Sequence, residues 1–400
     1  MKVLVFNCGS SSVKYQLYLM PDEKVIAKGA VQRIGEDLSE AIQSSNGSEL
    51  KLEEHDENHD QALETIKKML THEEKGPLKS MKEIDACGHR VVHGGERFTG
   101  SIKIDAEIED VIEEFIDLAP LHNPANLAGI KAVDHMMGDV PQVACFDTAF
   151  HQSIPKVAYL YALPYEMYTD FKIRKYGFHG ISHRYVARRA AKMMGKEKYG
   201  VNLITCHLGS GSSITAIKDG KSIDTSMGLT PLEGLVMGTR TGDVDAAIIF
   251  HLKRKGYSVV DQEKIFNKKS GLLGISGISN DVRDLENHAA QGEKRAELAL
   301  DIFAYKIKKY IGMYLGILNG CDGIVFTGGI GENGIIMRKR ILEDMENLGI
   351  HLDNEKNSIK ENIEREIHAD DSNIKVFVIP TNEEKAIARD TFKIVTNGSI

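Results

Sequence analysis

The chain has no tryptophan, few prolines and only five cysteines among its 400 residues. The two nearest cysteines, Cys87 and Cys145, are 58 residues apart, so the sequence has neither a Cys-x-x-Cys zinc motif nor the spacing of a disulfide framework. It also lacks any run approaching ~18 apolar residues, and the apolar start at residues 3–6 is too short for a signal peptide. These absences predict a soluble, cytoplasmic protein with reduced thiols.

Positive charge is not in excess, because 50 Lys and Arg stand against 58 Asp and Glu, for a formal net charge of −8. Such a balance disfavours sequence-blind binding to nucleic acid or to anionic membranes, so we expect neither as a partner. Any anionic substrate must therefore meet locally clustered positive charge. The composition, with 42% hydrophobic residues, is typical of globular proteins, and 400 residues are enough for two domains with separate cores.

One sequence pattern occurs twice. An apolar run at residues 3–6 ends in a Gly/Ser segment and is followed by alternating residues 13–19, which predicts strand, tight turn, strand. The pattern returns at 203–217, so we infer an internal duplication with one copy opening each half. A chance match is the alternative, because hairpin turns favour Gly and Ser. With a shift of 200, Gly9 aligns with Gly209, Ser10 with Ser210 and Ser12 with Ser212.

A third glycine cluster, at residues 328–331, follows an apolar run and precedes a helical stretch at 335–348. Alternating strands and helices predict an α/β protein. We place one domain at 1–149 plus 384–400 and the other at 150–383, and residues 35–60 read as a polar surface segment. Further helical patterns fill roughly 57–72, 107–118, 124–137, 181–194, 243–254, 293–318 and 383–396.

The Gly/Ser turns are candidate phosphate cradles, because residues without Cβ let backbone N–H groups converge on an anion. Lys14 could add a compact positive charge. No Walker A loop is present: Gly220-Lys221-Ser222 would need glycine at position 215, which is threonine, and Asp219-Gly220 reads as a hairpin turn. Taken singly, each turn is more often structural, whereas three turns at strand ends favour nucleotide binding.

Two arginines lie next to glycines, Arg90 in a mostly apolar segment and Arg240 in Gly-Thr-Arg-Thr-Gly. The guanidinium fork suits carboxylates and phosphoryl oxygens, although either arginine could instead pair with a structural carboxylate. His179 and Asp147 are each flanked by aromatic residues that would exclude water, yet a lone histidine of this kind is more often a core residue.

Eight segments together resemble the acetate kinase family, within the superfamily of acetate and sugar kinases, Hsp70 and actin. The resemblance runs in order from residue 1 to about 395. It implies an α/β fold of two duplicated ribonuclease H-like (actin-like ATPase) domains around a nucleotide cleft, and a homodimer. The segments are NCGSSSVK (7–14), HRVVHGGERF (89–98), FDTAFH (146–151), YGFHGISH (176–183), HLGSGS (207–212), MGTRTGDVD (237–245), TGGIGEN (327–333) and NEEKAIAR (382–389).

The resemblance implies reversible, Mg²⁺-dependent, in-line phosphoryl transfer from ATP to acetate, giving acetyl phosphate and ADP, with Mn²⁺ as an alternative metal. Arg90 would bind the acetate carboxylate, with Asp147 as an acid/base or orienting group, and His179 and Arg240 would stabilise the moving phosphoryl. The other positions are Val92, Leu121, Phe178 and Pro231 around the acetate methyl; Asn7 and Glu383 at the metal; and Lys14, Ser10, Ser12, His207, Leu208, Gly209, Ser210, Gly211, Asp281, Val282, Arg283, Gly329, Ile330, Gly331, Glu332 and Asn333 at the nucleotide.

Two positions need a separate interpretation. Ser210 stands where the family usually has asparagine, so a side-chain contact with the phosphates is in doubt while the backbone amides of the turn still serve. An acetate acceptor is already ionised at pH 7, so a general base is superfluous and we expect Asp147 to orient Arg90 or Arg240.

Two rivals remain. A propionate kinase of the same family is the nearest, although Val92 argues against its roomier pocket. A non-enzymatic nucleotide switch, like Hsp70 or actin, is the more distant rival, but no residues are left over for a peptide-binding domain.

Overall fold

The computed structural model describes residues 1–120, 122–196 and 200–398, and the chain divides into two compact units. Unit 1 comprises Met1–Gln152 together with the C-terminal segment that begins at Asn382, and unit 2 comprises Ser153–Thr381. The domain boundaries drawn from the sequence, after residues 149 and 383, stay predictions. No helix in the described part of the chain combines the length and the hydropathy needed to cross a bilayer.

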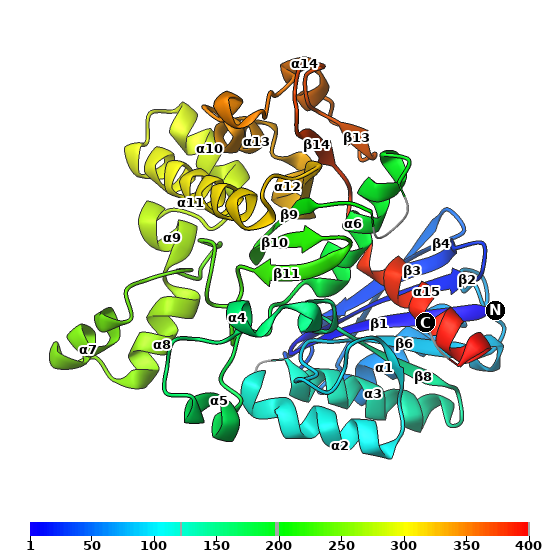
Figure 1. Cartoon of the computed structure of the whole chain (residues 1–400). Helices are drawn as coiled ribbons and strands as arrows, with labels where there is room; N and C mark the ends of the chain where they lie inside the picture. Colours follow the sequence, from blue (N-terminus) through cyan, green and yellow to red (C-terminus); the bar gives the residue numbers. More distant parts are fainter. Residues whose placement is uncertain (121, 197–199, 399–400) are drawn as a thin grey trace. The chain divides into compact units, whose positions relative to one another are not determined.

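Unit 1 is built on an eight-stranded sheet in the order β5-β4-β3-β2-β1-β6-β8-β7 (Figure 1). Neighbours from β5 to β1 are antiparallel, whereas β1, β6 and β8 run parallel. The strands are Lys2–Gly9 (β1), Ser12–Leu19 (β2), Lys24–Gln32 (β3), Ser39–Ser45 (β4), Ser48–Glu54 (β5), Ala86–Val91 (β6), Ile102–Lys103 (β7) and Gln142–Phe146 (β8).

Helices cover both faces of this sheet, and β1 is therefore buried on both sides. Leu4, Phe6 and Cys8 join the core formed with helices α1 and α3. The opposite face meets helix α15, where Gly88 of β6 leaves room for Ile387 and Thr391. Alternation along β1 and β6 therefore decides which side chains point toward α15. The helices are His59–Leu70 (α1), Ala106–Glu114 (α2), Asn123–Met137 (α3) and Glu383–Asn397 (α15).

Unit 2 has a six-stranded sheet in the order β11-β10-β9-β12-β14-β13 (Figure 1). Strands β11, β10 and β9 are antiparallel neighbours, and β9, β12 and β14 run parallel. The central strands carry short apolar runs, as expected for strands buried on both faces. The strands are Leu203–Leu208 (β9), Ser212–Lys218 (β10), Lys221–Thr225 (β11), Gly323–Thr327 (β12), Arg365–Glu366 (β13) and Lys375–Val378 (β14).

Two long helices cover the faces of this second sheet. Helix α11 packs its apolar stripe on Ile204, Cys206 and Leu208 of β9. Helix α6 contacts β9 and β12, and its Ser182 and His183 are hydrogen-bonded to the alternate residues of β9, His207 and Thr205. The helices are Lys156–Tyr159 (α4), Glu166–Phe171 (α5), Gly180–Met193 (α6), Ala247–Arg254 (α7), Val259–Lys268 (α8), Gly271–Ser276 (α9), Val282–Ala290 (α10), Lys294–Leu318 (α11), Gly328–Asn333 (α12), Ile335–Leu342 (α13) and Asn354–Asn357 (α14).

The two units repeat one core topology, with three antiparallel strands followed by two parallel ones (β3-β2-β1-β6-β8 and β11-β10-β9-β12-β14). Each copy opens with the predicted strand–turn–strand, and the predicted Asp219-Gly220 turn joins β10 to β11. Some elements differ from the expectation. Residues 35–60 contain strands β4 and β5, and the helix expected over 335–348 ends at Leu342.

Candidate active site

In unit 1, Arg90 is the centre of a polar cluster formed by residues that are far apart in the sequence. Its Nη2 donates to Asp147 Oδ2 at 2.5 Å and its Nη1 to Asn7 Oδ1 at 3.3 Å. Its Nε lies 3.7 Å from Glu383 Oε2. The Asp147 side chain is only 1% exposed, against 20% for Arg90. The fold thus brings three residues named in the sequence analysis, Asn7, Asp147 and Glu383, around a fourth, Arg90.

Sheet geometry explains this convergence. Gly88 and Arg90 alternate on β6, and the Gly88 position faces α15, so Arg90 points toward the same helix. Asn7 pairs with Lys14 across β1 and β2. Glu383 is the first residue of α15. Asn382 caps this helix, and its side chain accepts from the N–H of Lys385. The carboxylate therefore stands at a helix N-terminus.

Charge in this cluster is incompletely balanced. Burial raises the pKa of Glu383 to about 7; Asp147 adds to the rise, whereas Arg90 and Lys14 oppose it. Asp147 and Glu383 raise the pKa of Arg90 despite its burial, so the guanidinium stays charged. The other oxygen of Asp147, Oδ1, is buried without a hydrogen-bond partner among the described residues. The geometry is that of a carboxylate orienting an arginine.

The Gly/Ser turn of unit 1 is shorter than its polar segment, because β1 runs through Gly9 and β2 starts at Ser12. Ser10 is exposed at the tip, Ser12 is half-buried and Lys14 is exposed on β2. Gly9 O lies 2.9 Å from His59 Nε2 of α1, which fixes the turn from behind.

Residues expected around a small apolar pocket are divided between the units. Val92, 4% exposed, follows β6 in unit 1, and its N–H donates to Asn126 Oδ1 at 3.0 Å. Phe178 (3% exposed) and Pro231 belong to unit 2. Leu121 lies outside the described residues.

In unit 2, His179 and Arg240 converge on the second Gly/Ser turn. A Cβ added at Gly211 would lie 3.5 Å from His179 Cε1 and 3.6 Å from both His179 Nε2 and Arg240 Nη1. The two side chains therefore bracket the glycine, although 60 residues separate them in the sequence. Two cationic or hydrogen-bonding groups beside a turn rich in N–H groups can hold an anion.

The backbone and hydrogen bonds of His179 orient its ring. His179 is the N-cap of α6, in the left-handed region with φ 56°. Its Nδ1 lies 2.9 Å from Ser213 Oγ, which is 2.7 Å from His183 Nε2. The ring also stacks on His207, with centroids 4.3 Å apart. The Nε2 edge is thereby turned toward Gly211.

Arg240 is held in a different way from Arg90. Its Nη1 donates to Pro231 O at 2.9 Å and approaches Met237 Sδ at 3.5 Å. Within the described part of the chain Arg240 forms no ion pair, and burial lowers its pKa. A half-buried guanidinium without a carboxylate partner is prepared to bind an anion.

A pocket of about 410 Å³ opens beside the same turn. Its walls come from the Gly/Ser turn, the start of α10 and the glycine cluster at α12. Asp281 caps α10 and forms an ion pair with Arg283 at 2.6 Å. The lining residues are Gly209, Ser210, Asn280, Asp281, Val282, Arg283, Glu286, Gly329, Ile330, Asn333 and Gly334.

These features can be compared with known proteins. The sequence matches the model of the Acetokinase family over residues 2–389. The chain belongs to the acetokinase family. The acetate kinase of Clostridium novyi is 53% identical over 401 residues, covering 100% of both chains, and that of Methanosarcina acetivorans is 56% identical over 396 residues, covering 98% of this chain and 97% of the relative.

Solved structures of acetokinases show the same fold. Porphyromonas gingivalis acetate kinase has a TM-score of 0.95 at 46% identity, covering 99% of this chain and 100% of that one. A propionate kinase from Francisella tularensis has a TM-score of 0.92 at 42% identity, covering 98% and 99%. The fold class and the family predicted from the sequence are confirmed.

Several positions of the acetokinase motifs do not line this pocket. Leu208 lies in the core under α11, and Gly331 packs against the backbone of Phe326. The carboxylate of Glu332 turns back to accept from Gly328 N at 2.9 Å and Thr381 N at 3.0 Å. His207 contacts Ser182 and His179 instead. These residues build the pocket from behind.

Three lining residues were missed by the sequence reasoning, namely Asn280, Glu286 and Gly334. Glu286 lies on α10 one turn after Val282, so helical spacing from the DVR segment could have found it. Asn280 and Gly334 directly adjoin motif segments. Only the folded structure shows that they line the pocket.

Unit 1 also has the oxygen groups that a magnesium ion requires. The described residues contain no group of three or more His, Cys, Asp or Glu arranged to hold a metal. Mg²⁺ usually keeps several waters and takes only one or two protein oxygens, so such a group is unnecessary. The Asn7 amide oxygen and the Glu383 carboxylate both approach Arg90. The raised pKa of Glu383 marks a carboxylate that an added cation would stabilise. The residues fit the ion.

Proposed function

We propose that this acetokinase is an acetate kinase, which reversibly transfers the γ-phosphoryl group of ATP to acetate to give acetyl phosphate and ADP. The observation that carries the proposal is the convergence of His179 and Arg240 on Gly211, beside the pocket at α10 and α12. Relatives named acetate kinase, more than half identical over essentially the whole chain, support the same activity.

Arg90 binds the acceptor in this proposal. Acetate is ionised at pH 7, so its carboxylate can attack phosphorus without losing a proton to a base. Asp147 accepts from Nη2 of Arg90 and Asn7 accepts weakly from Nη1, whereas Nε has no hydrogen bond to a described residue and lies 3.7 Å from Glu383 Oε2. Asp147 therefore fixes the plane of the guanidinium, and the remaining donors meet the substrate.

Arg240 and His179 stabilise the transferring phosphoryl group. Phosphoryl transfer needs little covalent help, and its main cost is the approach of two anions. In the transfer step the bond from the γ-phosphorus to the bridging oxygen of ADP breaks as the bond from an acetate oxygen forms. Donors fixed beforehand near the equatorial oxygens lower this barrier, because they need no reorganisation as charge develops. In the proposed reaction, Arg90 holds the attacking acetate, whereas His179 and Arg240 act on the phosphoryl group.

Mg²⁺ completes the charge balance when bound, by neutralising nucleotide phosphate oxygens. Asn7 and Glu383 would hold the ion or its water ligands. Lys14, which is exposed on β2, would approach the phosphates as a point charge. Mn²⁺ takes similar oxygen ligands and is the expected substitute.

Acetate is preferred to propionate in this proposal because Val92, rather than a smaller residue, occupies its place in the pocket. The propionate kinase among the structural relatives makes this the alternative function. One methylene is worth only ~1–3 kcal/mol, so discrimination is expected to be graded.

Trapping of acyl phosphate with hydroxylamine tests both points. The protein, ATP and Mg²⁺ are incubated with acetate, propionate or butyrate, and kcat/KM is measured for each acid. We expect the highest value for acetate. A higher value for propionate would favour the alternative, and no acyl hydroxamate with any of the acids would contradict the proposed activity.

We also propose a homodimer in the cytoplasm. Helix α7 and the residues after it display Ile249, Phe250, Val259 and Val260 at 44–72% exposure, and no residue of α7 is buried. A second copy of the chain would cover this apolar surface. Light scattering of Phe250→Glu should show a shift toward monomer; an unchanged mass would place the interface elsewhere. Cell fractionation tests the compartment.

A further inference from the structure

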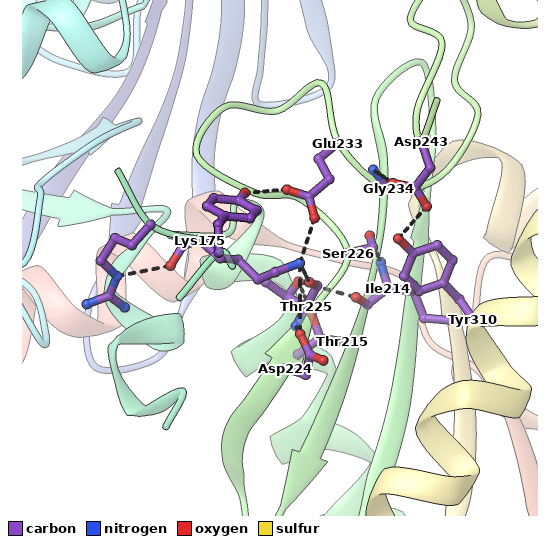
Figure 2. Close-up of polar contacts among 12 residues, drawn as sticks. Lys175, Ile214, Thr215, Asp224, Thr225, Ser226, Glu233, Gly234, Asp243 and Tyr310 are labelled. Carbon is purple, nitrogen blue, oxygen red and sulfur yellow. Dashed lines mark hydrogen bonds and ion pairs between the residues drawn. The ribbon is translucent and has the colours of Figure 1, made fainter. Parts of the chain in front are cut away.

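A group of charged and hydroxyl side chains lies in unit 2 beside the segment that carries Arg240, and the proposed reaction does not use it (Figure 2). Its centre is Lys175, whose side chain is only 12% exposed. The Lys175 amine donates to Glu233 Oε1 at 3.1 Å and to Thr225 O at 2.9 Å, and lies 4.0 Å from Asp224 Oδ1. Two hydrogen-bond acceptors and a neighbouring carboxylate leave this amine little freedom.

The second oxygen of Glu233 accepts a hydrogen bond from the Tyr161 hydroxyl, which itself accepts from Leu229 N at 2.9 Å. Burial and the Glu233 carboxylate raise the pKa of Tyr161, so the phenol keeps its proton. A Cβ at Gly228 would lie 1.8 Å from Glu233 Oε2 and 2.1 Å from Tyr161 Oη. The glycine therefore makes room for this pair.

The far end of the same segment is closed by Asp243. Its Oδ1 accepts from Gly234 N at 2.8 Å, its N–H donates to Gly234 O at 2.9 Å, and its Oδ2 accepts from Tyr310 Oη of α11 at 2.7 Å (Figure 2). Gly234 has φ 105°, and a side chain there would strike the backbone of Ser226. Residues 234–243 thus form a loop with both ends fixed.

These contacts join the two segments that carry the phosphoryl-stabilising residues. Lys175 stands four residues before His179, and the N–H groups of Tyr176 and Gly177 donate to Gly228 O at 3.0 and 3.2 Å. Glu233 follows Pro231, whose carbonyl accepts from Arg240. The Lys175–Glu233 contact and these two backbone hydrogen bonds therefore connect the His179 segment to the Arg240 segment.

We propose that Lys175, Glu233 and Tyr161 form a brace that sets the separation of His179 and Arg240, and are positioning residues for phosphoryl transfer. The proposal rests on the proposed function. None of the three needs to touch substrate. Their effect arises because a displacement of about 1 Å in a group that acts on the transition state can cost roughly 10²-fold in rate.

The brace could in principle stabilise the fold alone, since removing one partner of a buried ion pair is destabilising. Coupling to Arg240 separates the two roles. If the brace acts through Arg240, its loss matters only while Arg240 is present. A general weakening of the fold would lower activity by the same factor in either background.

The experiment is a double-mutant cycle of Glu233→Gln with Arg240→Ala, read as kcat at saturating ATP and acetate. We expect Glu233→Gln alone to lower kcat about 10- to 100-fold with KM values changed less than about threefold. In the Arg240→Ala background the same substitution should lower kcat less than about threefold. Equal factors in the two backgrounds would overturn the proposal.

Companion variants keep the test decisive. Lys175→Met should reproduce the loss and Lys175→Arg should restore most of it, because arginine can still donate to Glu233 and Thr225. Tyr161→Phe removes a single hydroxyl and replaces Glu233→Gln in the cycle if that variant does not fold. Lys356→Met, which breaks an exposed pair with Asp370 in the same unit, is the matched control and should retain wild-type kcat.

The outcomes also separate this inference from the proposed function. Absence of acyl phosphate from the wild-type protein contradicts the function itself. An active wild type whose brace variants keep normal kcat, or whose Lys175→Arg is as impaired as Lys175→Met, contradicts only the brace.

Discussion

Arg240→Ala removes a guanidinium that the fold holds by one backbone carbonyl, at 2.9 Å, and balances with no carboxylate of the described residues. Burial lowers the pKa of this side chain. Such a group interacts weakly with the resting protein and strongly with an anion beside it. Its loss should therefore be felt mainly in the transition state.

The expected magnitude follows from the contacts. Loss of one fixed donor to a developing oxyanion typically costs about 10²–10³ in kcat, or ~2.7–4 kcal/mol of activation free energy. The structural cost is smaller, because only the hydrogen bond to Pro231 O, worth ~1 kcal/mol net, and the weak contact with Met237 Sδ are lost. The variant should remain folded, and KM for ATP and acetate should change little.

The assay is the hydroxamate rate at saturating ATP, Mg²⁺ and acetate, with thermal unfolding measured in parallel. Arg295→Ala is the matched control, because Arg295 also donates to a backbone carbonyl of unit 2, Ile275 O at 2.9 Å, yet is exposed. We expect the control to keep kcat within about twofold, as is usual for a surface substitution. A near-normal kcat in Arg240→Ala would remove this arginine from the mechanism.

Three further predictions follow from other parts of the structure. Arg90→Ala should raise KM for acetate about 10- to 100-fold through loss of charge-assisted hydrogen bonds worth ~1.5–3 kcal/mol, and an unchanged KM in initial-rate measurements would contradict its carboxylate role. Val92→Ala should raise the propionate-to-acetate ratio of kcat/KM by roughly 10-fold, because one methylene is worth ~1–3 kcal/mol; a constant ratio would place the acid elsewhere. Arg338→Met should lower Tm by about 5–10 °C, since the fully buried guanidinium donates to four neutral acceptors of Gly331, Glu332 and Asn357. Arg340→Met, whose ion pairs are at the surface, should shift Tm by less than about 2 °C, and equal shifts would refute the argument.

Local features of the sequence predicted much of the fold. Alternating apolar residues around Gly9 and around Gly209–Gly211 indicated two hairpins, and both are present because turn chemistry and alternation act over a few residues. Strands β4 and β5 were not predicted, because every second residue faces solvent and the segment was interpreted as a polar surface stretch. Helices α8 and α10 were missed for a similar reason, since few of their residues are buried.

The site residues were named from motifs, but the sequence left open which arginine Asp147 would orient. From the sequence, Arg90 could have paired with any structural carboxylate. Its partner is Asp147 because β6, which carries Arg90, lies next to β8, which ends just before Asp147, and no local pattern encodes the register of these two strands. Lys175 and Glu233 had no signal at all, because a lysine and a glutamate 58 residues apart look like ordinary surface charges.

By itself, then, the sequence determined the repeated hairpins, the glycine turns and the family, all of which depend on neighbouring residues or on whole motifs. Tertiary structure alone decided which charges are buried together: Glu383 against Arg90, Lys175 against Glu233, and Arg338 among carbonyls. The reason is physical. Burial and pairing depend on strand order and on which face of a sheet a helix covers, and both are settled only when distant segments pack.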